Sequence, residues 1–153
     1  MNRIKHSAAA KIFLVLLGLY TLFFVAGGIL TPIFAHFRNF EAAGALYEIL
    51  GRSCQQDALR SFWITGYQMA VCARCFGAYI GFLTSIILAL SGRQFGKTMF
   101  IIFAVLALGE KAAEFAGFEG NNYIRLISGC FLGCFLFIIP LLAIKIFKGV
   151  KDV

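Results

Sequence analysis

The longest uncharged stretch of the chain runs from Ile12 to Ala35 and is mostly apolar. A helix rises about 1.5 Å per residue, so about 20 residues cross a hydrocarbon core about 30 Å thick. The stretch therefore predicts a membrane-spanning helix. It is longer than the roughly 7–15 apolar residues of a secretory signal core, and further apolar segments follow. We therefore expect it to be retained in the mature protein.

Composition supports a membrane protein throughout. Hydrophobic residues make up 61% and charged residues 14% of the 153 residues, whereas soluble domains have roughly 45–50% and 25%. The fold class we expect is all-α, a single polytopic membrane domain over residues 1–153 built as a four-transmembrane-helix bundle. The four helices are expected at about residues 12–35, 71–92, 98–117 and 124–147.

The third predicted helix differs from the others in its charge. Its uncharged part, Thr98 to Gly109, is too short to span a bilayer alone. It spans only if the helix continues and carries Glu110 and Glu114 to the far membrane edge. These two carboxylates are four residues apart, so they share one face of the helix.

The distribution of charge predicts the orientation. Four spans place both termini on one side, together with eight basic residues and one acid, whereas the opposite side holds six of each. Basic residues concentrate on the cytoplasmic side of membrane proteins, so we expect a cell inner (plasma) membrane protein with both termini cytoplasmic. The net charge of +7 then reflects topology, and we expect no nucleic-acid partner. The basic residues assigned to the inner side are Arg3, Lys5, Lys11, Arg93, Lys97, Lys145, Lys148 and Lys151.

The first outer connection is long, from about residue 35 to 71. Within it, residues 38–51 predict an amphipathic helix that lies in the membrane interface. Phe40, Ala43, Tyr47 and Leu50 share one face of that helix.

Cysteines provide the most specific local pattern. Cys72 and Cys75 are three residues apart where the second spanning helix begins on the outer side, and Cys54 precedes them in the loop. Such thiols can share a metal ion, most simply zinc, or form a redox dithiol. His36 would complete a set of three cysteines and one histidine. An odd thiol on this side could instead pair with Cys130.

Charged residues near the outer edge form a second cluster. Arg74 and Arg125 begin the second and fourth helices on the side where Glu110 and Glu114 end the third. Ionisable groups near membrane depth usually pair and face the protein interior. The cluster either pins the helices together or lines an outward pocket, in which Arg60 and Arg74 would grip an anion.

Two glycine pairs have the small-xxx-small spacing that lets helices approach closely. They are Gly77 with Gly81 and Gly129 with Gly133. We interpret them as helix contacts, which would also permit a homo-oligomer.

One stretch also carries a family resemblance: Cys54-Gln55-Gln56, Arg60-Ser61-Phe62, Cys72-Ala73-Arg74-Cys75, Gly77, Tyr79 and Gly81. It resembles a bacterial and archaeal family of small multi-pass membrane proteins of unknown function, with Cys-His-Gln, Arg-Ser-Phe and Cys-x-Arg-Cys-x-Gly-x-Tyr-x-Gly. Asn121-Asn122, Arg125-Leu126, Gly129 and Gly133 resemble a second block of that family. The resemblance implies no activity, but it singles out Cys54, Arg60, Ser61, Cys72, Arg74, Cys75 and Arg125. Gln55 stands where the family has histidine, which weakens a metal site unless His36 or a carboxylate substitutes.

Three functions follow as hypotheses. The first is a lipid-embedded binding protein that holds zinc through Cys54, Cys72, Cys75 and His36. Its pocket would bind a small anionic or lipid ligand through Arg60, Ser61, Arg74, Glu110, Glu114 and Arg125. The alternative is a quinone-coupled thiol-disulfide oxidoreductase, with Cys72 and Cys75 as the catalytic pair and Cys54 as the shuttle. Against it, the second outer loop, from Lys111 to Arg125, has no cysteine. A second alternative is an oligomeric transporter or channel.

Overall fold

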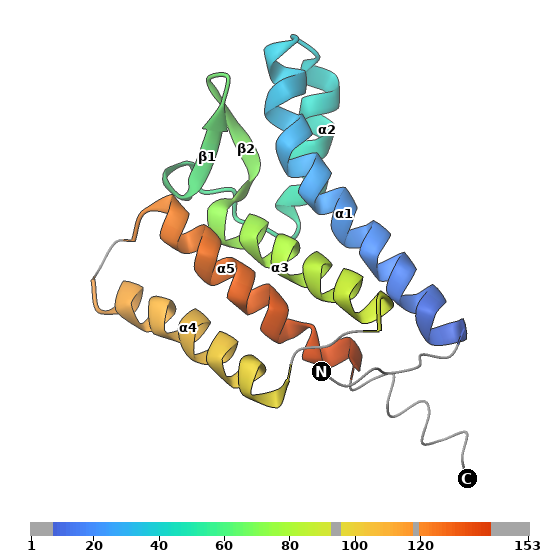
Figure 1. Cartoon of the computed structure of the whole chain (residues 1–153). Helices are drawn as coiled ribbons and strands as arrows, with labels where there is room; N and C mark the ends of the chain where they lie inside the picture. The colour runs from blue at the N-terminus through green and yellow to red at the C-terminus, as the bar shows by residue number, and fades with distance from the viewer. Residues whose placement is uncertain (1–7, 93–95, 118–119, 142–153) are drawn as a thin grey trace.

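The structure is a computed structural model that describes residues 8–92, 96–117 and 120–141. It is mostly helical (Figure 1), with helices α1 (Ala8–His36), α2 (Phe40–Gly51), α3 (Ala73–Leu90), α4 (Lys97–Phe115) and α5 (Asn122–Leu136). Three helices are long and apolar enough to cross a membrane: Ala8–His36, Ala73–Leu90 and Asn122–Leu141. They correspond to three of the four predicted spans, and residues 142–147 of the last prediction lie outside the described residues.

The four long helices form an open row. Helix α1 packs on α3, α3 on α5, and α5 on α4, and Figure 1 shows α3 and α5 between the other two. Over the described ranges, α1 and α4 share no extensive contact. The expected four-helix bundle is therefore corrected to a row, because α5 uses one face for α3 and another for α4, which leaves α1 on the far side of α3.

Helices α3 and α5 meet through glycine. A Cβ atom on Gly81 would lie 2.0 Å from the Cys130 carbonyl oxygen, and one on Gly77 would lie 2.1 Å from that of Leu126. On α5, a Cβ on Gly133 would lie 2.0 Å from the Ala78 oxygen. These contacts confirm the prediction that the glycines join helices. They also cover both glycine faces within one chain, so these faces are not free to join two copies, as the spacing alone would permit.

The contacts also give the direction of the two helices. Residue 77 faces 126 and residue 81 faces 130, so the residue numbers rise together and α3 runs parallel to α5. Helix α4 runs antiparallel to α5, because Glu110 meets Ser128 whereas the earlier Phe103 stacks on the later Phe131.

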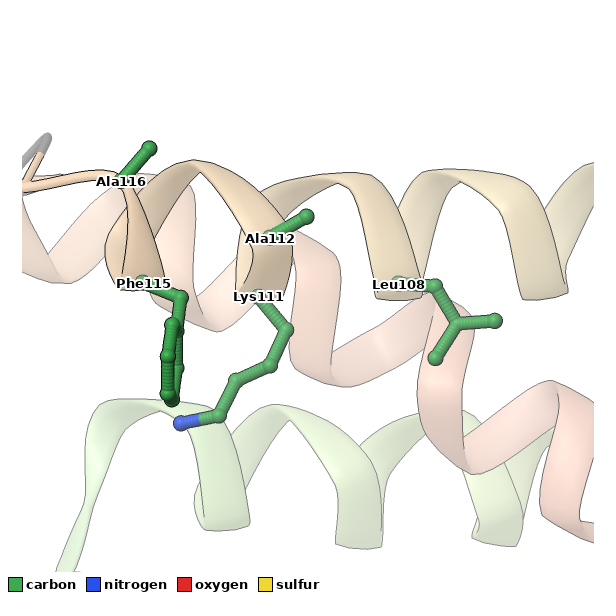
Figure 2. A pocket seen from close by; sticks show the side chains of 5 residues that line it. All are labelled: Leu108, Lys111, Ala112, Phe115 and Ala116. Carbon is green, nitrogen blue, oxygen red and sulfur yellow. The ribbon is translucent and has the colours of Figure 1, made fainter.

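Two faces of α4 have different neighbours. The face with Phe103, Ala107, Glu110 and Glu114 turns inward; Phe103 and Ala107 are buried, and the carboxylates are 12% and 13% exposed. A second face lines a shallow, open groove of about 520 Å³ (Figure 2). The groove residues are Leu108, Lys111, Ala112, Phe115 and Ala116.

The all-α expectation is wrong between α2 and α3. Strands β1 (Ser61–Ile64) and β2 (Tyr67–Cys72) form an antiparallel hairpin. Thr65 and Gly66 connect them with φ values of 52° and 82°, as a two-residue hairpin turn with positive φ at both positions requires. The sequence did contain an indication of this hairpin, the aromatic and β-branched run Phe62-Trp63-Ile64 followed by Thr65-Gly66. Strand β2 buries Met69, Ala70 and Val71, and it packs on α1.

Helix α2 is present close to its predicted range, but its apolar face packs on the protein. Ala43 and Leu50 are buried, and Leu50 belongs to a cluster with Phe24 of α1 and Val71 of β2. Its position relative to a bilayer stays a prediction. In α5 the regular helix is interrupted at Phe137, because Pro140 has no N–H to donate to the carbonyl of residue 136.

Candidate metal and anion site

The hairpin determines where the cysteines of α3 lie. Strand β2 leads directly into α3, so Cys72 is the residue that caps the helix and Cys75 lies in its first turn. Since β2 is held against α1 by its buried residues, the start of α3 is fixed relative to α1. Both thiols are half-buried.

Gln56 holds the loop that carries Cys54. Its side-chain amide donates to the carbonyl oxygens of Tyr47 (2.8 Å) and Ala70 (2.9 Å), and so joins α2 to β2. Its own carbonyl accepts from Gln68 at 2.6 Å. Gln56 has a φ of 53°, a left-handed conformation that non-glycine residues seldom adopt. The sequence did not predict this role for Gln56. The only indication was an amide side chain two residues after Cys54.

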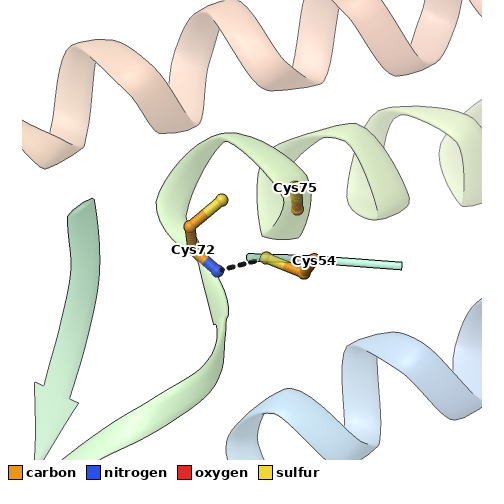
Figure 3. Close-up of side chains that lie close together, drawn as sticks. All are labelled: Cys54, Cys72 and Cys75. Atoms are coloured by element: carbon orange, nitrogen blue, oxygen red, sulfur yellow. Dashed lines mark hydrogen bonds between the residues drawn. The ribbon is translucent and has the colours of Figure 1, made fainter. Parts of the chain in front are cut away.

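Cys54, Cys72 and Cys75 come together in space. Their sulfur atoms all lie within 4.8 Å of one another, and Figure 3 shows Cys54 opposite the first turn of α3. The backbone N–H of Cys72 donates to the Cys54 sulfur at 3.2 Å. Hydrogen bonds from the thiols of Cys72 and Cys75 hold the pKa of Cys54 well below its usual range, despite the opposing effect of burial. Among the three thiols, Cys54 is the one whose pKa the neighbouring groups lower.

His36 does not belong to this group. Among the described residues, the ligand atoms that cluster are the three sulfurs, whereas His36 is exposed at the end of α1 with its ring against Phe37. Cys130 is likewise outside the group, since it packs at the contact between α3 and α5.

Glu114 is the centre of an ion-pair network beside the cysteines. Its carboxylate lies 2.9 Å from Arg74, 3.1 Å from Arg60, 3.0 Å from Lys111 and 3.6 Å from Arg125. Arg60 also pairs with Asp57 at 3.3 Å. These cations come from the segment before β1, from α3, from α4 and from α5. The Glu114 carboxylate therefore joins four parts of the fold.

Glu110 extends the network by one turn of α4. Arg74 donates to both of its oxygens at 2.7 Å, and the Ser128 hydroxyl donates to it at 3.1 Å. Arg125 is only 9% exposed. Ion pairs this sheltered are strongly destabilising to break, since the remaining charge stays buried without a partner.

The cysteines and the cations line one cavity of about 240 Å³. Four basic side chains and one acid contribute, together with all three thiols: Ser53, Cys54, Gln55, Asp57, Arg60, Cys72, Arg74, Cys75, Lys111 and Arg125. Ser61 does not line it; this residue is 1% exposed and its hydroxyl donates to the Asp57 carbonyl. Ser53, Asp57 and Lys111 also line the cavity, and the sequence did not predict them as site residues.

The comparison with known proteins covers this same segment. Residues 54–139 match the family described as "Predicted membrane protein (DUF2085)". The chain belongs to this family. It is also 32% identical over 115 residues to an uncharacterized protein of Methanocaldococcus jannaschii, with 69% of this chain and 74% of that protein covered. No solved structure matches the chain. The family segment begins at Cys54, so it includes the hairpin, the three thiols and the ion-pair network.

Proposed function

We propose that this membrane protein binds one divalent metal ion, most simply zinc, through Cys54, Cys72 and Cys75, beside a pocket for an anionic ligand. The observation that carries the proposal is the convergence of three thiols on the wall of one cavity. Tetrahedral zinc–sulfur bonds of about 2.3 Å place sulfur atoms about 3.8 Å apart. The sulfurs, all within 4.8 Å of one another, need only a small movement to reach that geometry.

The surroundings favour a charged metal–thiolate group. Zinc with three thiolates carries one net negative charge, and the four cations that line the cavity outnumber by one the three carboxylates that they pair with, Asp57, Glu110 and Glu114. Three protein ligands leave one tetrahedral position for water or another ligand, as in zinc sites that exchange ligands. Gln55 also lines the cavity, so a fourth protein ligand at this position would be within its walls.

We further propose four membrane crossings. Helices α3 and α5 are parallel and side by side, so if both cross the bilayer, the chain must cross back between them. Helix α4 lies between them in the sequence and runs antiparallel to α5. Glu110 and Glu114, at its outer end, are paired with cations, which lowers the cost of carrying them near the membrane.

This topology sets the remaining placements. The distribution of charge supports cytoplasmic termini in the inner (plasma) membrane, which puts the three thiols and the cavity at the outer edge. Helix α2 and the hairpin would then lie at or above the outer interface. Trp63 on β1 is 59% exposed, and tryptophan is enriched at such interfaces.

A combined metal and thiol count tests the proposal. We expect full-length protein, purified without added reductant or chelator, to contain one zinc per chain by elemental mass spectrometry. Cys54→Ser should remove that zinc. The matched control is Cys134→Ser, since Cys134 is buried and faces the Gly81 carbonyl away from the thiol group. Protein without stoichiometric metal, or with Cys72 and Cys75 joined as a disulfide, would overturn the proposal, and the disulfide would favour redox chemistry.

A further inference from the structure

We infer that the anionic ligand is a lipid, whose phosphate lies in the cavity of about 240 Å³ and whose acyl chain lies in the groove along α4. The inference rests on the anion pocket of the proposed function and does not depend on the metal. It is carried by the position of Lys111, which lines both the cationic cavity and the apolar groove. The two spaces therefore meet at one cationic side chain.

Two arginines that line the cavity have unused hydrogen-bond donors. In the part of the chain that the structure describes, the Nε atoms of Arg74 and Arg125 are buried without a hydrogen-bond partner, as is the Oε1 atom of Glu114. The three carboxylates of the network thus leave some guanidinium donors of these arginines unused. Guanidinium groups bind phosphate through paired, charge-assisted hydrogen bonds. Arg60 is 44% exposed and Lys111 57% exposed, so both can reorient toward a ligand.

The volume of the cavity fits more than a metal ion and its water. A water molecule occupies about 30 Å³ of liquid, so about 240 Å³ corresponds to roughly eight waters. A phosphate group fits in this space beside a metal bound at the thiols.

The groove provides the apolar half of the site. Its residues are three, four, seven and eight positions from Leu108, so they form one stripe on α4. Leu108 and Phe115 are 66% and 94% exposed, and Figure 2 shows both extending from the helix on the same side as Lys111. If α4 crosses the bilayer, this stripe lies at the level of the cations, with Leu108 on the deeper side of Lys111 and Phe115 on its outer side. A soluble anion would leave the groove unused, whereas a lipid phosphate occupies both spaces.

Lipid retention by the full-length protein tests the inference. Detergent-purified protein is mixed with phosphatidic acid or with diacylglycerol of the same acyl chains, which lacks the phosphate, and bound lipid is measured by native mass spectrometry. We expect phosphatidic acid to be retained at least about tenfold better, as one or more charge-assisted hydrogen bonds would give. Inorganic phosphate should compete only weakly, because it makes no contact with the groove.

Variants separate the two halves of the site. Ala112→Trp fills the groove and should weaken phosphatidic acid binding, whereas Ala113→Trp, an exposed neighbour outside the groove, should not. Lys111→Gln should weaken it about tenfold, whereas Arg52→Gln should not, since Arg52 is exposed and pairs only with Glu48 in the described structure. Circular dichroism of each variant confirms the fold.

Each outcome supports or overturns the lipid site. Equal retention of the two lipids, equal effects of the two tryptophans, or inorganic phosphate binding as tightly as the lipid would each overturn the inference. Zinc is counted in the same preparations. Selective lipid binding without zinc would leave the inference standing and remove the metal site, and zinc without selective lipid binding would do the reverse.

Discussion

The parallel contact between α3 and α5 supports the proposed topology, and Gly81→Ala tests it directly. The new Cβ would lie 2.0 Å from the Cys130 carbonyl oxygen, whereas real Cβ contacts essentially never fall below 3.0 Å. The two backbones must therefore separate by about 1 Å. Because Gly77, Gly129 and Gly133 make equally short contacts with backbone atoms along the same seam, that separation loosens the whole interface.

The expected cost follows from this geometry. Overpacking a tight contact costs about 1–3 kcal/mol. Because the atoms in contact are backbone and no flexible side chain can move aside, we expect the free energy of unfolding to fall by about 3 kcal/mol. For a chain of this size that lowers Tm by about 6–12 °C. Thermal unfolding in detergent, followed by circular dichroism, measures it.

The same substitution at an open position provides the control. Gly44 lies in α2, and a Cβ added there would have nothing within 4 Å, so Gly44→Ala should raise stability by about 0.5–1 kcal/mol through helix propensity. The two alanine variants should thus change Tm in opposite directions. If Gly81→Ala unfolds at the temperature of the unaltered protein, the close parallel contact is wrong, and the support for a fourth crossing is lost with it.

Three further predictions concern the site and the topology. Glu114→Gln leaves four cations without their shared carboxylate and should cost about 2–4 kcal/mol of stability. The control is Glu48→Gln, in a pair with both side chains 79% exposed, which should change stability by less than about 0.5 kcal/mol. Equal losses of stability in chemical denaturation would contradict the network. Gln55→His should tighten zinc binding by adding a ligand in the cavity, measured by competition with a chelating dye, and unchanged affinity would place residue 55 out of reach. A cysteine introduced at Ala116 should react with an impermeant maleimide added outside intact cells, giving more labelling than the unaltered chain does. A cysteine introduced at Ser91 should give no such increase, and equal labelling at the two positions would refute four crossings.

The sequence was sufficient for the features that depend on one segment alone. Uncharged stretches as long as the bilayer is thick predict α1, α3 and the last span, because an unpaired charge in hydrocarbon is too costly. The spacing of Cys72 and Cys75 at a helix start likewise follows from local order. Two glycines four apart predict a helix contact, since small residues on one face permit a close approach.

Features that need two distant segments required the tertiary structure. A two-stranded hairpin is marginal in isolation, and β1 with β2 is stable here because Val71 and its neighbours pack on α1. That packing brings Cys54 to Cys72 and Arg60 to Glu114. No local pattern predicts either contact, because each depends on how the loop folds back.

The uncharged stretch from Ile12 to Ala35 thus predicted by itself a helix long and apolar enough to cross a bilayer, since hydrophobic length is a property of one segment. The sequence also determined that thiols and charges lie near one edge of the predicted spans. Only the tertiary structure decided that they share one cavity, that His36 is not part of it, and that Lys111 connects it to a groove. The physical reason is that burial and ion pairing join groups that are close in space, whatever their separation along the chain.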